Sequence, residues 1–413
     1  MPHTPNLNNF RTSSGTSLAN LNLGWITKEY LMSVYPQIAN QITTPELWVW
    51  GSNYSRQLGI GNNVSKSTPV TTFAGGANWK QVSSGYRHVM AVKTDGTLWG
   101  WGAENNLLAG GNLGTNAPSS FDVIRCTPVT TFAGGTDWKQ VSCGGNHTAA
   151  VKTDGTLWLW GNNYQRQLGT NSSNLEILTP VTTFAGGTDW KQVSCGAFEY
   201  TATFTAAIKT DGTLWTWGLN YNYASQSQPL GINVDGFDAR RDTPVTTFAG
   251  GTNWKQVSCG YNHMSAIKTD GTLWIWGDNA FGQLGTNNTT AALTPVTTFA
   301  GGTNWKQVSA GFRSSSAIKT DGTLWVWGSN QNTPITTFAG GTTWKQVAYG
   351  SNYIAAIKTD GALWTWGANY SGQLGTNNTT ARFTPVTTFA GGTDWKQVSC
   401  GGAACAIKSA DSI

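Results

Sequence analysis

The sequence has little charge and no long apolar run. Only 11% of its 413 residues are charged, whereas 51 are glycine and 22 are tryptophan. No stretch of 18 or more apolar residues occurs, and the first 30 residues lack the basic and then apolar pattern of a secretory signal. This composition excludes a disordered polyampholyte and a helical protein rich in Ala, Glu and Lys. It is typical of short strands joined by turns, and we expect no membrane insertion.

Positive charge is spread along the chain rather than clustered. The net charge is +5, and 14 of the 25 Lys and Arg residues occupy two fixed positions of a repeat. A nucleic-acid-binding domain usually gathers its basic residues on one face or in one stripe. We therefore expect no specific nucleic-acid partner.

The six cysteines lack the spacing of a metal or disulfide framework. Four of them share one repeated slot, "VSCG": Cys143, Cys195, Cys259 and Cys400. The other three copies hold Ser84, Ala310 and Tyr349 in that slot. A metal ligand or a bridge would not accept these replacements, so buried free thiols are favoured. Cys400 and Cys405 are the one pair that calls for a check.

Three sequence landmarks recur seven times: "TPVTTFAGG" or a close variant, "WKQV" and "LWxWG". Each copy reads as four strands, "TPVTTF", "WKQVS", "AIK" or "AVK", and "TLWxWG", because β-branched and aromatic residues dominate these segments. The long, variable segment after "LWxWG" is expected to carry the chain to the next sheet. Four strands in each repeat of about 40 to 50 residues predict an all-β, seven-bladed β-propeller with four-stranded antiparallel blades.

The two ends of the chain each carry part of a repeat. An "LWVWG" at 47–51 has no "KTDG" before it, and an "AIK" at 406–408 has no "LWxWG" after it. The last blade should therefore combine three strands from residues 384–408 with a fourth strand from the N-terminal end, which closes the ring. The expected domains are a short N-terminal extension, 1–46, and the propeller, 47–413. The ring-closure residues are Leu47, Trp48, Val49, Trp50, Ala406, Ile407 and Lys408.

The N-terminal extension does not share the repeat. Its first half is rich in Asn, Ser and Thr, and its second half predicts a short helix that opens near Thr27 and is interrupted at Pro36. We expect the extension to dock on a partner, with capping of the last blade as the alternative. Its apolar anchors are Trp25, Tyr30, Leu31, Val34 and Tyr35.

Two repeated polar positions are candidates for chemistry. The first is a "G-x-x-H" slot with His88, His147 and His263, whose other occupants are Glu199, Ser314, Tyr353 and Ala404. These imidazoles could converge on a zinc ion, but a hydrogen-bonded structural role is favoured. The second is the aspartate of "TDG", where equivalence by repetition favours a turn residue over an acid–base pair, with the neighbouring lysines pairing locally across the sheet. The aspartates are Asp95, Asp154, Asp211, Asp270, Asp321 and Asp360.

No nucleophile elbow, Walker loop, zinc-protease motif or dinucleotide fingerprint occurs in a suitable context. We therefore expect no enzyme activity, catalytic residue, metal or cofactor. Twenty-one of the 22 tryptophans belong to repeat slots, which indicates packing between blades rather than a sugar platform. The loop aromatics stay open to binding: Tyr54, Tyr164, Tyr221, Phe281 and Tyr370.

A family resemblance follows from the segments after "LWxWG". These read "SNYSRQLGIGNN" at 52, "NNYQRQLGTNSS" at 162 and "DNAFGQLGTNNTT" at 278. Together with "G-x-x-H" and "A-[IV]-K-T-D-G-x-L-W-x-W-G", the chain over 47–408 resembles the regulator of chromosome condensation repeat, a family of seven-bladed propellers. The near-identity of the copies is similar to that of bacterial and bacteriophage members.

The resemblance implies a fold more firmly than an activity. The best-known member of the family is a guanine-nucleotide exchange factor that binds chromatin, many relatives serve as interaction platforms, and no exchange residue can be matched in this sequence. We expect a non-catalytic assembly and display module, a bacteriophage tail or capsid appendage assembled in the host cytoplasm, or otherwise a cytoplasmic protein. Its expected partners are other virion proteins and a host-surface ligand. The alternatives are an exchange factor or chromatin-binding propeller, and a carbohydrate-binding surface protein.

Overall fold

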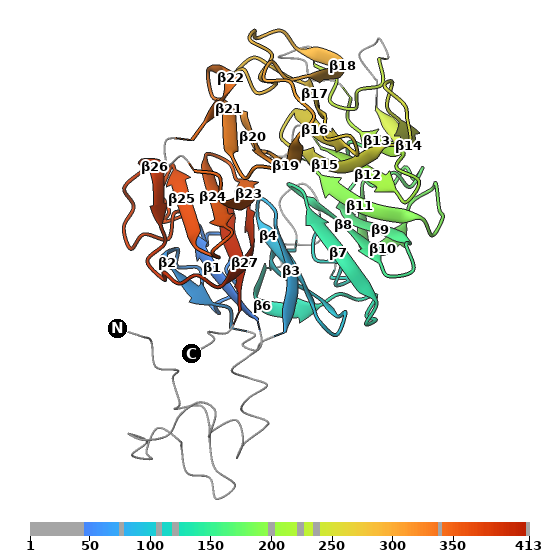
Figure 1. The fold of residues 1–413 in the computed structure, drawn as a ribbon. Helices are drawn as coiled ribbons and strands as arrows, with labels where there is room; N and C mark the ends of the chain where they lie inside the picture. The colour runs from blue at the N-terminus through green and yellow to red at the C-terminus, as the bar shows by residue number, and fades with distance from the viewer. Residues whose placement is uncertain are drawn as a thin grey trace, which may run out of the picture. The chain divides into compact units, whose positions relative to one another are not determined.

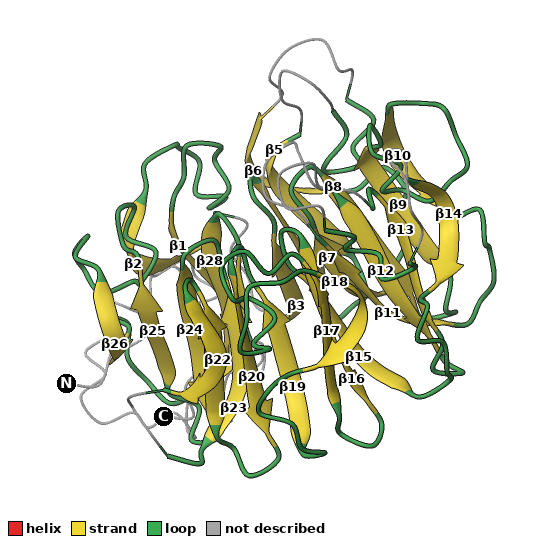
Figure 2. Ribbon diagram, turned by 90° about the horizontal axis from the view of Figure 1, so that it is seen from above, coloured by secondary structure: helices red, strands yellow, loops and turns green. Residues whose placement is uncertain are grey.

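A computed structural model describes residues 45–73, 78–104, 110–117, 124–196, 203–220, 227–233, 240–337 and 341–409. Within these ranges the chain forms 28 strands in seven four-stranded antiparallel sheets. Figure 1 shows the sheets as blades around a common axis, and Figure 2 shows loops at both ends of their strands. None of the described residues is helical, so no helix that could span a membrane is found among them.

The first four blades follow one another directly along the chain. Blade 1 holds β3 (Trp79–Ser84), β4 (His88–Lys93), β5 (Leu98–Ala103) and β6 (Ile124–Thr130). Blade 2 holds β7 (Trp138–Cys143), β8 (His147–Lys152), β9 (Leu157–Asn162) and β10 (Glu176–Thr182). Blade 3 holds β11 (Trp190–Cys195), β12 (Phe204–Lys209), β13 (Leu214–Gly218) and β14 (Arg241–Thr246). Blade 4 holds β15 (Trp254–Cys259), β16 (His263–Lys268), β17 (Leu273–Gly277) and β18 (Ala292–Thr297).

The last blade joins the two ends of the chain. Blade 5 holds β19 (Trp305–Ala310), β20 (Ser314–Lys319), β21 (Leu324–Gly328) and β22 (Gln331–Thr336). Blade 6 holds β23 (Trp344–Tyr349), β24 (Tyr353–Lys358), β25 (Leu363–Gly367) and β26 (Arg382–Thr387). Blade 7 has the order β2-β1-β28-β27, from β1 (Glu46–Gly51), β2 (Lys66–Thr71), β27 (Trp395–Cys400) and β28 (Ala403–Lys408).

The grouping of strands differs from the expected one. Each blade begins with "WKQV" as its inner strand and ends with "TPVT" as its outer strand, so "LWxWG" and the following "TPVT" are neighbours in one sheet. The variable linker between these two strands only turns the chain back, and a linker of that kind tolerates different lengths. The expectation that this linker carries the chain to the next sheet was wrong. That step is made by the uniform segment between "TPVT" and "WKQV".

Ring closure itself is confirmed. The N-terminal strand β1 pairs with β28 in the register Leu47 with Ile407 and Trp48 with Ala406. However, β2 also belongs to this sheet, so the closing blade takes two strands from each end of the chain. The expected division of three strands and one strand was wrong, because the "TPVT" strand at 382–387 completes blade 6.

A belt of glutamine side chains joins the inner strands around the axis. The Gln81 amide nitrogen donates to the Val141 carbonyl at 2.9 Å, and the Gln81 amide oxygen accepts the Val141 N–H at 2.8 Å. The same pair of bonds recurs at every junction, and Gln397 closes the belt on Val82 at 3.2 and 3.0 Å. A side-chain amide thus satisfies the edge of each inner strand, which has no further strand beside it.

Tryptophans and lysines fill the space between blades. In each blade the "WKQV" tryptophan meets both "LWxWG" tryptophans with ring centroids 6.0–6.5 Å apart. The "KTDG" lysine lies over two of these rings, as Lys93 does at 4.5 and 4.9 Å. The lysines therefore interact mainly with aromatic faces. Among the described residues, three of them also pair with an aspartate, at 3.2–3.4 Å: Lys152, Lys209 and Lys408.

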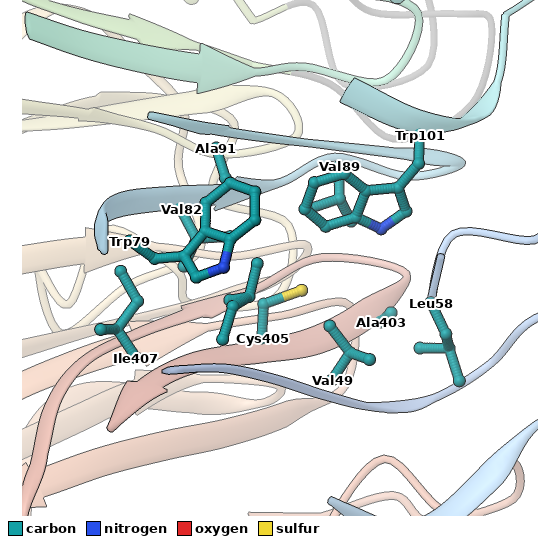
Figure 3. Close-up of a cluster of buried hydrophobic side chains, with 11 residues drawn as sticks. Val49, Leu58, Trp79, Val82, Val89, Ala91, Trp101, Ala403, Cys405 and Ile407 are labelled. Carbon is teal, nitrogen blue, oxygen red and sulfur yellow. The ribbon is translucent and has the colours of Figure 1, made fainter. Parts of the chain in front are cut away.

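A leucine from each long linker inserts between neighbouring blades. Figure 3 shows Leu58 of the blade 7 linker beside Trp101 of blade 1, in a cluster with Val49 and Ala403. We call this Leu and the Gly that follows it the wedge. The wedge leucines are fully buried: Leu58, Leu113, Leu168, Leu230, Leu284 and Leu374.

Candidate protein-interaction site

The two ends of the strands form faces of different character. The turns after the inner strands and the variable linkers lie at the same end, since Ala103 N–H donates to the Arg87 carbonyl and Asp278 N–H to the Asn262 carbonyl. We call this end the loop face and the end with the "TDG" turns the hairpin face. Sequence differences among the copies concentrate on the loop face, so a partner that selects one sector of the ring would bind there.

The aspartates of the hairpin face stabilise their own turns. Asp95 accepts the Thr97 N–H at 2.9 Å and the Thr97 hydroxyl at 2.7 Å, and Thr97 in turn accepts the Trp99 indole N–H at 2.9 Å. These bonds hold the pKa of Asp95 below its usual value, and four equivalent aspartates share this geometry and lowered pKa. A carboxylate held ionised in this way suits a turn better than general acid catalysis.

The three slot histidines each bond to a hydroxyl of the next blade. His88 Nε2 lies 2.9 Å from the Thr148 hydroxyl, which donates its own proton to the Asn112 carbonyl at 2.8 Å. The hydroxyl must therefore accept from Nε2–H, which places the proton of the neutral ring on Nε2. His147 with Thr205 and His263 with Ser315 repeat the arrangement at 3.0 and 2.9 Å.

Burial strongly disfavours protonation of these histidines. Their rings are fully buried and Nδ1 has no hydrogen-bond partner. Desolvation lowers the pKa of His88 to about 4 and that of His147 and His263 to about 3. The rings belong to three separate blades, and no group of three His, Cys, Asp or Glu side chains that could hold a metal occurs in the described part of the chain.

Two assignments of the histidine slot were wrong. Strand β12 places Phe204 in the slot of blade 3 instead of Glu199, and β28 places Ala403 in that of blade 7 instead of Ala404. The slot is set by its distance from the strand-ending lysine, whereas the turn before it is longer in blade 3 and shorter in blade 7. Glu199 lies outside the described residues. Phe204 packs in one core cluster with Met264, an apolar equivalent of the histidine–hydroxyl contact.

The axial opening on the loop face is lined by the ends of the inner strands. It encloses a cavity of about 120 Å³ bordered by the slot that holds Cys143, Cys195, Cys259 and Cys400 in four blades. All six cysteines are free thiols. Burial raises the pKa of Cys143, Cys259 and Cys400 to about 12, so these groups are neutral thiols and poor metal ligands at neutral pH. Cys400 and Cys405 do not form a disulfide.

An arginine and three aromatic side chains meet on the loop face between blades 4 and 5. The Arg313 guanidinium lies 4.0 Å from the Phe281 ring centroid and 4.8 Å from that of Phe312. The Phe312 ring is 4.9 Å from that of Tyr261. Arg313 is exposed and the three aromatic residues are half-buried. We call these four residues the Arg313 cluster.

Blade 5 presents the Arg313 cluster because its own linker is very short. Only Ser329 and Asn330 separate β21 from β22, so no long loop of this blade rises beside the cluster. Sequence reasoning missed Tyr261, Phe312 and Arg313. The two positions after "G" in "G-x-x-H" could have indicated them. These positions vary between copies that are otherwise almost identical.

The structure does not gather the predicted loop aromatics into one site. Tyr54, Tyr164 and Tyr370 are 79%, 41% and 83% exposed and lie in the linkers of blades 7, 2 and 6. Phe281 alone joins the Arg313 cluster. Tyr221 lies outside the described residues, as do the proposed docking anchors Trp25, Tyr30, Leu31, Val34 and Tyr35.

A second group of aromatics was not anticipated. The phenylalanine of "TPVTTF" follows each outer strand and is 64–71% exposed at Phe73, Phe132, Phe184, Phe248, Phe299 and Phe389. The threonine before it is buried, as Thr72 and Thr131 show. Among the residues that the structure describes, these phenylalanines add apolar surface beside six outer strands.

These features define the class of the protein: a closed seven-bladed β-propeller with uniform inner strands and a variable loop face. A family model of the regulator of chromosome condensation (RCC1) repeat matches residues 46–92, 95–151, 154–201, 270–318 and 360–407, more than half of the chain. The chain belongs to the RCC1 repeat family.

Similar proteins include the ultraviolet-B receptor UVR8 of Arabidopsis thaliana, 29% identical over 287 residues, which are 68% of this chain and 60% of the receptor. The mitochondrial RCC1 domain-containing protein RUG3 of the same plant is 27% identical over 294 residues, 69% of this chain and 61% of RUG3. This chain thus spans about three fifths of the length of these two relatives.

Two solved structures share the fold. Human WBSCR16 superposes with a TM-score of 0.73 at 19% identity, over 88% of this chain and 99% of that chain. Prp20p of Saccharomyces cerevisiae, whose structure was described with its binding to Gsp1p and histones, gives a TM-score of 0.72 at 18% identity, over 90% and 94%. Identities this low establish the common fold alone.

Proposed function

We propose that this chain is a non-catalytic protein-interaction module that binds its partner through the loop face of blades 4 and 5. The observation that carries the proposal is the Arg313 cluster, in which an exposed guanidinium stacks on Phe281 and Phe312. Arginine and aromatic residues are enriched among the residues that dominate binding energy at interfaces. The aromatic rings also hold the guanidinium in place, which lowers the entropy that binding would cost.

The roles of the repeated polar residues support a non-catalytic function. The histidines are neutral and bonded to the next blade, and five "TDG" aspartates stabilise hairpins. The axial thiols have a raised pKa. Among the described residues, these histidines, aspartates and thiols have structural roles. None of them is held in a state suited to an acid, a base or a nucleophile.

Site-specific crosslinking tests the proposal. A photoreactive phenylalanine analogue at Phe312 should capture a discrete partner in the native host, whereas the same analogue at Thr94 on the hairpin face should not. With that partner purified, Phe312→Ala or Arg313→Ala should weaken binding at least about 30-fold, as at a binding hot spot. Arg87→Ala, which removes the equivalent turn residue of blade 1, is the matched control. An affinity unchanged by both blade 5 variants would refute the proposed surface.

A finer proposal places the module in a bacteriophage virion, as a tail or capsid appendage. Its support is the near-identity of the copies, such as "TTFAGGTDWKQVSCG" in blades 2, 3 and 7. Mass spectrometry of purified particles tests this placement, because a virion component must co-purify with capsid or tail proteins at fixed stoichiometry. Recovery of the protein only from particle-free host fractions would contradict it.

Two alternatives have separate tests. An exchange factor would accelerate nucleotide release from a small GTPase in a panel assay, and a chromatin-binding propeller would bind nucleosomes. A carbohydrate-binding protein would bind a glycan array and lose that binding after Tyr370→Ala or Tyr164→Ala, because aromatic faces provide the stacking surface for sugar rings.

A further inference from the structure

Six of the seven junctions between blades are filled by a wedge. At each of these junctions the second "LWxWG" tryptophan donates its indole N–H to the carbonyl of the residue before the wedge leucine. Trp101 donates to Gln57 at 2.9 Å and Trp276 to Pro229 at 2.8 Å. The same bond joins Trp160 to Asn112, Trp217 to Gln167, Trp327 to Gln283 and Trp50 to Gln373 at 2.8–3.0 Å.

The wedge glycine is required by its contact with this tryptophan. All six glycines have a positive φ of 60–67°, and a Cβ there would lie 2.6–3.0 Å from an indole atom. A larger residue would be strained in this conformation and would collide with the ring. Each junction is therefore built to hold one short segment: a carbonyl, a leucine side chain and a glycine.

The junction between blades 5 and 6 has no wedge of its own. The blade 5 linker consists of Ser329 and Asn330 only, so this linker supplies no leucine to the space in front of Trp366. A cavity of about 160 Å³ occupies this position, with Val326, Ile335 and Ile354 among its lining residues. A space of this size accepts a small apolar group. We call it the 5/6 slot.

The surroundings of Trp366 differ from those of its six equivalents in exposure and in hydrogen bonding. It is 8% exposed, whereas its six equivalents are 0–2% exposed. Its indole N–H makes no hydrogen bond to any described residue, although every equivalent indole donates to a wedge carbonyl. Trp366 lines the cavity, so the carbonyl of a segment bound there would find a donor in this N–H.

We propose that the 5/6 slot binds a Leu–Gly segment of a partner protein. The leucine side chain fills the cavity, the carbonyl before it accepts the Trp366 N–H, and the glycine packs on the Trp366 ring. The slot and the Arg313 cluster both use the start of β20, since Ser314 lines the slot and directly follows Arg313. This inference rests on the proposed protein-interaction function and adds the chemistry of the segment recognised.

A labelled peptide with the sequence FGQLGTNN, which copies residues 281–288, is the probe. Fluorescence anisotropy with the full chain should show saturable binding at one site. A peptide with Asp in place of the leucine should not bind, since it would bury a charge in an apolar cavity. Trp366→Phe keeps an aromatic side chain but removes the indole N–H, and it should weaken binding at least about three- to tenfold, as expected for the loss of one hydrogen bond. Trp276→Phe, the same change at a filled junction, should leave the affinity unchanged.

A filled slot provides the decisive control. In a chimera that replaces Ser329 and Asn330 with residues 278–291, the blade 4 linker, blade 5 gains its own wedge and peptide binding should disappear. Thermal melting of the chimera checks that it is folded. Absence of saturable binding to the unmodified chain, or equal binding to the folded chimera, would overturn the inference.

A further comparison tests whether the segment in the 5/6 slot comes from a partner or from this chain. The sequence contains a seventh Leu–Gly pair, Leu23 and Gly24, outside the described residues. Equal peptide affinity for the unmodified chain and a Leu23→Ser chain supports a segment supplied by a partner. Binding only after Leu23→Ser would overturn that assignment. If the Arg313 cluster variants still abolish partner binding while the peptide never binds, the slot inference alone fails.

Discussion

Replacing His147 by Phe together with Thr205 by Met would copy a contact that the chain already makes one blade further on. There Phe204 occupies the histidine slot and packs in one cluster with Met264. The Gln167 carbonyl, which Thr205 now contacts, would keep its bond from the Trp217 indole at 2.8 Å. The double variant therefore removes one titratable group from the junction of blades 2 and 3 without leaving a buried polar group unpaired.

The expected effect is a smaller loss of stability in acid. The pKa of His147 is lowered to about 3 in the folded chain, from an ordinary value of 6.5. Below pH 6.5 the unfolded chain binds a proton on this residue and the folded chain does not, so stability falls as the pH falls from 6.5 towards 3. Between pH 7.5 and pH 5.0 each such histidine costs about 2 kcal/mol, and His88, His147 and His263 together cost about 6 kcal/mol.

Urea denaturation at the two pH values measures this difference. The unmodified chain should lose about 2 kcal/mol more than the double variant between pH 7.5 and pH 5.0. The "TDG" aspartates do not disturb the comparison, because both proteins contain all of them and their effects cancel in the difference. His263→Phe with Ser315→Met should reproduce the result at another junction. Equal losses in the variant and the unmodified chain would refute the argument that these rings stay neutral in the folded state.

Three further substitutions and one chemical probe follow from the structure. Gln192→Leu would leave the N–H and carbonyl of Val257 unpaired and should destabilise the chain by about 2–4 kcal/mol in urea denaturation, whereas Lys191→Ala should have little effect. Glu104→Gln should raise the melting temperature at pH 8 but not at pH 4, because burial raises the pKa of Glu104 and its contribution to stability is lost as the pH rises through that value. Leu284→Ala should cost about 2–5 kcal/mol by emptying a filled junction, and a loss below 1 kcal/mol would contradict the role of the wedge. Ellman's reagent should modify half-buried Cys126 well before the four buried thiols, Cys143, Cys195, Cys259 and Cys405, and their reaction together with Cys126 would contradict the buried assignment.

The propeller could be predicted from the sequence because the repeated motifs can be counted directly. Seven copies of "WKQV" and "LWxWG" predicted seven blades, and the incomplete copies at 47 and 406 predicted which segments meet. The start of a blade could not be predicted in the same way. A cyclic repeat has no first strand, and residue types do not reveal that "LWxWG" pairs with "TPVT" across a linker of variable length.

The candidate site depended on distances that the sequence does not contain. The aromatic prediction included Phe281 but treated it as a lone loop residue, because Arg313 stands 32 positions further on and meets it only when blades 4 and 5 lie together. The lysines of "KTDG" were expected to pair with charges, since sequence proximity favours a neighbouring aspartate. In the structure the ammonium group of Lys93 lies over two tryptophan rings, at 4.9 and 4.5 Å from their centroids, and Lys152, Lys209 and Lys408 add an aspartate to the same contact.

Blade 7 takes strands from both ends of the chain, so it can be completed only at the end of synthesis. Strands β1 and β2 leave the ribosome first, but β27 and β28 follow more than 300 residues later. At typical elongation rates this interval is about 20–60 s. Throughout that time the edge of β1, "ELWVWG", that will pair with β28 has no partner strand. The nascent chain therefore carries an open strand edge, a site of possible aggregation, until its last strands are made, and the closed ring is available only after that.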